Sequence, residues 1–298
     1  MSLTKKQFDV LVYLCERKTS ASQREIAAKT GNSVGSVNKV MSELSELCLV
    51  SSGKITDKGI EALEPYRVKK AIFIAAGFGS RLVPITLNTP KPLVRVKGTR
   101  IIDTLLDAVI AAGIEEIYIV RGYLGEQFDQ LLAKYPMIKF IENPAYNECN
   151  NISSAYLARE YIGNSYVFEA DLLLYNPAII TKYQYCTNYL GVPTKRTDDW
   201  CFFVDANGRI TKMGIGGVDC HHMYGISYYT EEDGKRLAGH LEEVFKNVPG
   251  GKEKYWDEVS LSYYIDEYKI FVRECTFEDI IEIDTFNELK KLDSNYAM

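Results

Sequence analysis

A short apolar run that leads into a loop of small residues constrains this chain more than any other feature. Residues 70–75 read Lys-Ala-Ile-Phe-Ile-Ala, which is typical of a buried parallel strand. The next residues, 76–81, are Ala-Gly-Phe-Gly-Ser-Arg. Small residues let a backbone approach a ligand closely, and successive amides in such a loop form a concave anion site. The sequence therefore predicts a polyphosphate-binding loop built from Ala76, Gly77, Gly79, Ser80 and Arg81.

Two common phosphate-binding motifs are excluded by the residues of this glycine loop (76–81) and its exit. A dinucleotide-binding GxGxxG motif needs a third glycine, and Leu82 occupies that place. A Walker loop needs Gly-Lys-Ser/Thr, which is missing. The alternative is an ordinary strand-to-helix turn. Lys91, held between two prolines, follows the loop and favours a functional role.

Strand and helix patterns alternate after the glycine loop. Helices are expected over 101–112 and 124–135, a strand with its exit loop over 116–123, and a further strand over 138–141. This alternation predicts an α/β fold with a doubly wound, mainly parallel sheet. Ligands in such sheets bind at the carboxyl ends of the strands, so Asn143 and the glycine loop are expected at one edge.

The first 66 residues follow a different pattern. Helices are expected over 5–17, from an N-cap at Ser22, and over 34–47, with a hairpin over 49–56 and a last helix from Asp57. This order resembles the winged helix-turn-helix modules of bacterial transcription regulators. The sequence thus predicts two domains, a winged helix at 1–66 and a second domain at 70–298.

DNA binding by the first domain has weak support. Its reading helix would offer Ser33, Ser36, Asn38 and one cation, Lys39, while acids and bases across the domain nearly cancel. Because phosphate neutralisation dominates DNA affinity, dimerisation or regulation is favoured over DNA binding, and a homodimer is one expected form.

Bulk properties indicate a cytoplasmic protein. The net charge of -5 gives no support for nucleic acid as the main partner. Seven scattered cysteines show no zinc or disulfide spacing, which is typical of a reducing compartment. The N-terminus lacks a signal-peptide pattern, and no apolar run approaches the roughly 18 residues of a membrane helix.

The string from Ala75 to Val94 resembles the signature of the sugar-phosphate and choline-phosphate nucleotidyltransferase superfamily. With the runs 122–128, 150–151, 169–171, 199–200, 255–257 and 282–284, residues 70–292 are similar to bacterial CTP:phosphocholine cytidylyltransferases. The resemblance implies a Rossmann-like, GT-A-like nucleotidyltransferase domain. It also implies that CTP and phosphocholine give CDP-choline and pyrophosphate.

The resemblance also assigns roles around the nucleotide. Arg81 is expected on the β- and γ-phosphates, and Lys91 between the α-phosphate and the incoming phosphate. Mg²⁺ suits hard oxygen ligands, and the resemblance implies that Asp171, Glu282 and Asp284 hold it. Glu282 and Asp284, two residues apart on an expected strand, would share a face; helix capping at Thr285 is the alternative. Glu169 stands where aspartate is usual, so a direct metal contact by Glu169 is in doubt. Near the base, where helix capping is again the alternative, the resemblance places Asn143, Asn151 and Ser154.

The acceptor is expected to meet aromatic side chains. Aromatic faces with nearby acids suit a quaternary ammonium, although core packing is the commoner role of tryptophan. The resemblance implies a choline cage of Trp200, Tyr255 and Trp256, with Tyr228 as a further wall. The open alternatives are phosphoethanolamine, 2-aminoethylphosphonate or a sugar phosphate as acceptor. An alternative from another class is a DNA-binding regulator whose transferase-like domain senses a ligand.

Overall fold

The chain forms two compact units. A computed structural model describes residues 2–17 and 20–297. The small unit contains residues 1–67 together with 183–185, and the large unit contains 68–182 and 186–298. Within the described ranges, no helix combines the length and apolar character that crossing a membrane requires.

Among its described residues, the small unit has four α-helices and a two-stranded hairpin, in the order that the sequence predicts. Side-chain caps explain where its helices begin, because Thr4, Ser22, Ser33 and Thr56 each accept a hydrogen bond from a backbone amide in the first turn. Its elements are α1 (Lys5–Glu16), α2 (Gln23–Thr30), α3 (Val34–Glu46), β1 (Val50–Ser51), β2 (Lys54–Ile55) and α4 (Asp57–Leu63).

The core of the small unit includes a segment from much later in the chain. Tyr183 is buried in this core. The ring of Tyr185 stacks on Tyr66 with centroids 5.6 Å apart and packs on Phe8 at 5.3 Å. Its hydroxyl donates a hydrogen bond of 3.0 Å to the carbonyl of Leu3. No pattern in the sequence signals that residues 183–185 belong with the first 67.

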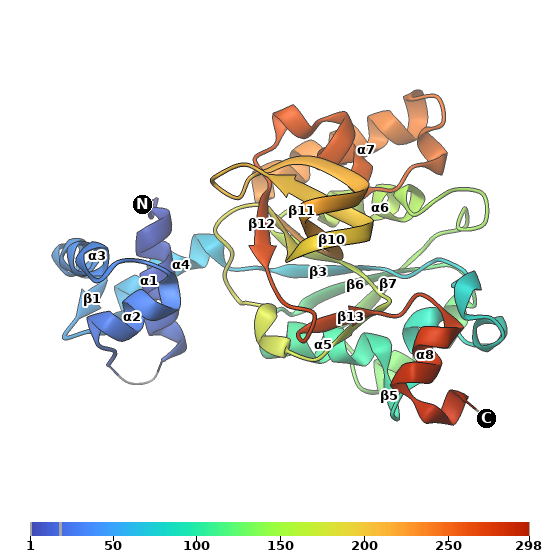
Figure 1. Cartoon of the computed structure of the whole chain (residues 1–298), viewed down its shortest axis with the longest axis horizontal. Coiled ribbons are helices and arrows are strands. Elements are labelled where there is room, and N and C mark those ends of the chain that lie inside the picture. The colour runs from blue at the N-terminus through green and yellow to red at the C-terminus, as the bar shows by residue number, and fades with distance from the viewer. Residues whose placement is uncertain (1, 18–19, 298) are drawn as a thin grey trace. The chain divides into compact units, whose positions relative to one another are not determined.

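The large unit is built on a seven-stranded sheet in the order β12-β10-β11-β8-β3-β6-β7 (Figure 1). Every neighbouring pair is parallel except those of β11, which runs antiparallel to β10 and β8. The prediction of an α/β fold with a mixed, mainly parallel sheet is confirmed. The strands are β3 (Lys70–Ile74), β6 (Glu116–Arg121), β7 (Ile138–Glu142), β8 (Ser165–Glu169), β10 (Asn188–Val204), β11 (Ile210–Tyr229) and β12 (Phe271–Glu274).

Helices cover both faces of this sheet. Successive side chains of β3 point to opposite sides, so they enter two different cores. Ala71 and Phe73 pack into one core with α5 (Ile101–Ala111). Ile72 and Ile74 pack into a second core with α6 (Ile152–Ala158) and α7 (Glu231–Asn247). Figure 1 shows α5 on one side of the sheet and α6 and α7 on the other.

Smaller elements lie at the rim of the large unit. Two short two-stranded sheets pair β4 (Arg95–Val96) with β5 (Thr99–Arg100) and β9 (Leu172–Leu174) with β13 (Ile280–Glu282). The last α-helix is α8 (Phe286–Leu292). The helix expected over 124–135 is instead a 3-10 segment, Gly125–Ala133. Leu124 precedes it in a left-handed conformation and gives no side-chain cap, so an α-helical start is not supported there.

Close packing of α7 gives a first prediction. A Cβ at Gly234 would overlap the carbonyl of Ile162, whereas a Cβ at Gly239, in the same helix, would meet nothing within 4 Å. We expect Gly234→Ala to lower the free energy of unfolding by about 2 kcal/mol or more through overpacking. Gly239→Ala should leave it unchanged or raise it by up to about 1 kcal/mol. Urea denaturation of both variants measures the difference, and equal stabilities would contradict this packing.

Candidate active site

The glycine loop packs tightly against the segment that carries Lys91. Gly79 adopts a left-handed conformation, with φ at 60°. A Cβ at Gly79 would lie 2.9 Å from the Cβ of Lys91 and 3.1 Å from Cγ2 of Thr86. The Thr86 hydroxyl also donates a hydrogen bond of 2.9 Å to the Gly79 carbonyl. Glycine at position 79 therefore meets both a conformational and a steric requirement.

Lys91 is buried among carboxylates. Its Nζ lies 2.7 Å from Oδ2 of Asp171 and 3.1 Å from Oδ1 of Asp284. Burial by itself lowers the pKa of Lys91, but the charges of Asp171, Asp284 and Glu282 outweigh it, and the net pKa is raised. Lys91 is thus a fixed cation at the carboxyl ends of the parallel strands.

Asp284 has cationic partners on the glycine-loop side. Its Oδ2 lies 2.7 Å from the mostly exposed guanidinium of Arg81. Asp284 follows the end of β13, so Glu282 and Asp284 do not share one strand face as the sequence predicted. Thr285 caps α8 in a capping box with Glu288, as the alternative interpretation expected. Asp284 therefore joins the strand to a capped helix and pairs with the two basic residues.

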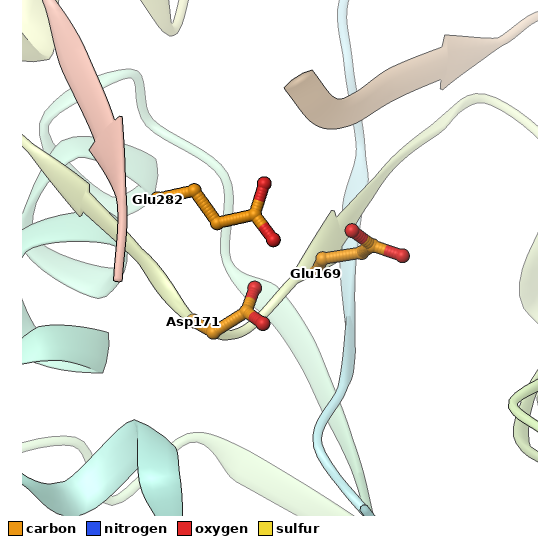
Figure 2. Close-up of side chains that lie close together, drawn as sticks. All are labelled: Glu169, Asp171 and Glu282. Carbon is orange, nitrogen blue, oxygen red and sulfur yellow. The ribbon is translucent and has the colours of Figure 1, made fainter. Parts of the chain in front are cut away.

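Figure 2 shows three carboxyl groups that lie close together, those of Glu169, Asp171 and Glu282. Glu169 ends β8, Asp171 follows it by two residues, and Glu282 ends β13. One oxygen of each lies within 4.8 Å of the others. Burial, followed by repulsion from neighbouring carboxylates, raises the pKa of Glu169 and that of Glu282 well above their usual range. The acidic cluster of Glu169, Asp171 and Glu282 therefore carries more negative charge than the nearby basic side chains neutralise.

A divalent cation fits this cluster. Oδ1 of Asp171 is buried and has no hydrogen-bond partner among the described residues. Carboxylate oxygens are the donor type that Mg²⁺ prefers. The geometry groups Glu169 with Asp171 and Glu282. The metal site predicted from the sequence contained Asp284 in place of Glu169. Because Glu169 and Asp171 are also two residues apart at a strand end, their spacing was an available signal.

Of the three residues expected near the cytosine base, two are buried and one lines the site. Asn143 and Ser154 are both buried, and the Asn143 amide donates hydrogen bonds of 3.0 Å to Ser153 and 2.9 Å to Ser154. These hydrogen bonds tie the loop after β7 to α6. Ala76 is buried as well. Asn151, in contrast, lines the open site.

The site consists of two adjoining hollows. Both are lined by Asn151 and by charged residues, namely Arg81, Glu169, Asp171 and Asp284. The first hollow adds Lys91 and the glycine-loop residues Gly77, Gly79 and Ser80. The second, with a volume of about 410 Å³, adds Asp199, Trp200, Met213, Met223, Gly225, Tyr255, Asp257 and Glu282. A phosphate-binding side and an aromatic, acidic side thus share one set of charged residues.

The aromatic side has two of the four expected walls. The rings of Trp200 and Tyr255 meet edge-to-face at 70°, with centroids 5.7 Å apart, and both line the second hollow. Trp256 is 1% exposed and packs in the core against Tyr189. Tyr228 is buried too, and its hydroxyl donates to Oδ1 of Asn164. Trp256 and Tyr228 line neither hollow, because the chain turns these side chains into the core.

Two acids complete the second hollow, and the sequence did not single them out as site residues. Asp199 precedes Trp200 on β10, and Asp257 follows the buried Trp256. Asp257 is itself buried, and its Oδ1 accepts a hydrogen bond of 2.9 Å from the Tyr189 hydroxyl. Burial raises the pKa of Asp257 to about 7, although the Tyr189 hydrogen bond opposes this. The second hollow can therefore hold a cation through both carboxylates and ring faces.

Comparison with known proteins identifies the family. Residues 70–188 match the family model described as nucleotidyl transferase. A 2-aminoethylphosphonate cytidylyltransferase from Lancefieldella rimae is 38% identical over 230 residues, which cover 76% of this chain and 93% of that protein. The chain belongs to the nucleotidyltransferase family, among its cytidylyltransferases. This cytidylyltransferase is also 33% identical to the choline-phosphate cytidylyltransferase of Haemophilus influenzae, over 76% of this chain and 98% of that protein.

A solved structure agrees with the fold of the cytidylyltransferase. The CTP:phosphocholine cytidylyltransferase from Streptococcus pneumoniae superposes with a TM-score of 0.71 at 30% sequence identity. The match covers 77% of this chain and 99% of the pneumococcal chain. The predicted nucleotidyltransferase activity is thus confirmed at the level of the family.

Proposed function

We propose that this cytidylyltransferase transfers CMP from CTP to a small acceptor with a phosphonate or phosphate at one end and an ammonium group at the other. The observation that carries the proposal is the second hollow. It joins the acids and rings of Asp199, Trp200, Tyr255 and Asp257 to the charged residues of the first hollow. An acceptor that spans the two would place its anionic end beside the α-phosphate of CTP.

The proposed reaction is an in-line displacement. An anionic oxygen of the acceptor attacks the α-phosphorus of CTP and forms a new P–O–P bond. The bond between the α-phosphorus and the oxygen bridging to the β-phosphate breaks, and pyrophosphate leaves. Because the attacking oxygen is already anionic, catalysis needs positioning and charge neutralisation rather than a base. Lys91 and Arg81 supply two cations for this purpose.

Mg²⁺ is proposed as the cofactor. Glu169, Asp171 and Glu282 would hold it, and their convergent oxygens support this choice. When bound, a divalent cation would neutralise charge on the phosphates of CTP. Asp284 takes part by fixing Lys91 and Arg81, which lie 3.1 Å and 2.7 Å from its oxygens.

Among acceptors, we favour a primary amine such as 2-aminoethylphosphonate over phosphocholine. A trimethylammonium group prefers a cage of aromatic faces, and two of the four expected walls lie in the core. A primary ammonium instead donates hydrogen bonds, for which Asp199 and Asp257 offer acceptors. The relative from L. rimae supports this choice. Phosphocholine is the second candidate, supported by the Trp200–Tyr255 corner and by the H. influenzae relative.

An acceptor panel with one variant pair tests the proposal. Pyrophosphate release is measured with CTP, Mg²⁺ and 2-aminoethylphosphonate, phosphocholine, phosphoethanolamine or glucose 1-phosphate. We expect the highest kcat/KM with 2-aminoethylphosphonate. Asp199→Asn should raise the KM for this acceptor about tenfold, as the loss of one charge-assisted hydrogen bond predicts, and change that for phosphocholine less.

Asp198→Asn is the matched control for Asp199→Asn, because the Asp198 side chain is 89% exposed and does not line either hollow. A preference for phosphocholine would overturn the choice of a primary amine. Release with a sugar phosphate alone would overturn the proposed acceptor class. No release with any acceptor, together with sequence-selective DNA binding, would favour a regulator whose second domain senses a ligand.

We also propose that residues 1–66 form a winged helix that pairs copies of the chain or regulates the enzyme. The proposal is supported by the order of α1 to α4 and by the left-handed turn at Gly31 between α2 and α3. Lys39 is the one basic residue in the sequence of α3, which favours such a role over DNA binding. A cytoplasmic location is proposed because all seven cysteines are free.

A further inference from the structure

The amide of Asn151 connects the two sides of the site. Asn151 lies just before α6 and lines both hollows. Its Oδ1 accepts a hydrogen bond of 2.9 Å from the backbone N–H of Trp256, between the two acceptor-side residues Tyr255 and Asp257. Its Nδ2 donates to Oε1 of Glu169 at 3.5 Å. We call residues 252–257, which include Tyr255 and Asp257 of the second hollow, the acceptor wall. The Asn151 side chain therefore contacts both the acceptor wall and the acidic cluster.

The orientation of this amide is fixed by chemistry. A backbone N–H can only donate, so the oxygen of Asn151 must face Trp256. The NH₂ group is then directed at Glu169, whose carboxylate accepts. Asn151 makes no side-chain capping bond to the start of α6 among the described residues. Each end of its amide thus has a protein partner on a different side of the site, and helix capping does not account for this arrangement.

Asn150 also forms hydrogen bonds to this acceptor-side segment, at residues 252 and 253. Its backbone N–H donates to the carbonyl of Lys252 at 2.8 Å, and its Nδ2 donates to the carbonyl of Glu253 at 3.1 Å. The turn at 150–151 thus holds residues 252–256 through three hydrogen bonds. Among the hydrogen bonds of the described residues, the bond to Glu169 is the one that leads from this turn into the acidic cluster.

We infer that Asn151 is a positioning residue that sets the acceptor wall and the Glu169 carboxylate in one shared geometry. The inference rests on the proposed function, since the wall is taken to bind the acceptor and Glu169 to belong to the metal site. It assigns Asn151 to the junction of the two hollows and away from the cytosine base. It also gives Asn150 and Asn151 different roles. Asn150 contacts the acceptor wall and, through its Oδ1, the backbone N–H of Asn151, whereas the Asn151 side chain contacts both the wall and the acidic cluster.

Three variants separate these roles. Asn151→Asp keeps an oxygen for the Trp256 N–H but loses the donor to Glu169, so we expect kcat to fall about tenfold with the acceptor KM within twofold of wild type. Asn151→Ala loses both bonds, so kcat should fall and the acceptor KM should rise at least about fivefold. Asn150→Ala loses one anchor of the wall and the acceptor for the Asn151 backbone N–H but keeps both Asn151 side-chain bonds, so the acceptor KM should rise and kcat should fall less than in Asn151→Ala.

Calorimetry without metal supplies a readout besides activity. The Kd for CTP should stay within about threefold of wild type in all three variants, and the melting temperature confirms folding. A tenfold weaker CTP affinity in Asn151→Ala would overturn the inference in favour of base recognition. Identical kinetics of Asn151→Asp and Asn151→Ala would overturn the split role. If the wild-type enzyme itself releases no pyrophosphate with any acceptor, it is the proposed function that fails.

Discussion

Asp171→Asn is expected to lower kcat for pyrophosphate release by about 10²–10³-fold, the range found when a charge-stabilising group is removed from an active site. The substitution keeps the size of the side chain but removes the charge. Asp171 is the member of the acidic cluster that also pairs with Lys91, at 2.7 Å, so both the proposed metal site and the fixed cation are affected. The measurement is pyrophosphate release against Mg²⁺ concentration at saturating CTP and acceptor.

The control for Asp171→Asn is Asp129→Asn. Asp129 also pairs with a basic residue, Arg121, at 2.6 Å, but its side chain is 60% exposed and lies outside both hollows. This variant should retain wild-type kcat. Activity of Asp171→Asn within tenfold of wild type at every Mg²⁺ concentration would show that the cluster does not serve the reaction.

Lys91→Met should lower kcat by about 10³-fold and also destabilise the protein. Methionine fills a similar volume but leaves Asp171 and Asp284 without their buried cation. Breaking a buried ion pair from one side typically costs about 3–5 kcal/mol, because the remaining charge is uncompensated. A divalent cation should replace part of the missing charge. We therefore expect Mg²⁺ to raise the melting temperature of Lys91→Met more than that of wild type.

Lys195→Met is the matched control, since the Lys195 side chain is 93% exposed and pairs with Asp219 on the surface. Neither its activity nor its response to Mg²⁺ should differ from wild type. If Mg²⁺ shifts the melting temperature of Lys91→Met no more than that of Lys195→Met, the carboxylates around Lys91 do not form a cation site.

The local features of the site could be predicted from the sequence, because they depend on short stretches of chain. The strand at 70–74, the glycine loop and Lys91 lie within about 20 residues, and the sequence and the structure agree that they adjoin one another. The alternation of helices and strands was equally local, and it led to the correct α/β class. In each case the pattern and the geometry follow from neighbouring residues.

The misplaced residues depend on contacts between distant segments. Whether Glu169 or Asp284 joins the cluster is decided by where β13 ends and by the pairing of Asp284 with Arg81 and Lys91. Which of Tyr255 and Trp256 faces the hollow is decided by the docking of their segment on Asn150 and Asn151. Neither spacing nor composition contains this information.

The small unit has a consequence for how such a chain can be cut or recombined. Tyr183 and Tyr185 complete its core, although some 115 residues of the large unit separate them from Arg67. An enzyme shortened to begin at residue 70 would keep these two tyrosines and lose the side chains that bury them. A transplant of residues 1–67 onto a relative would lack the tyrosines. Cutting or transplanting residues 1–67 alone therefore separates the small unit from part of its own core.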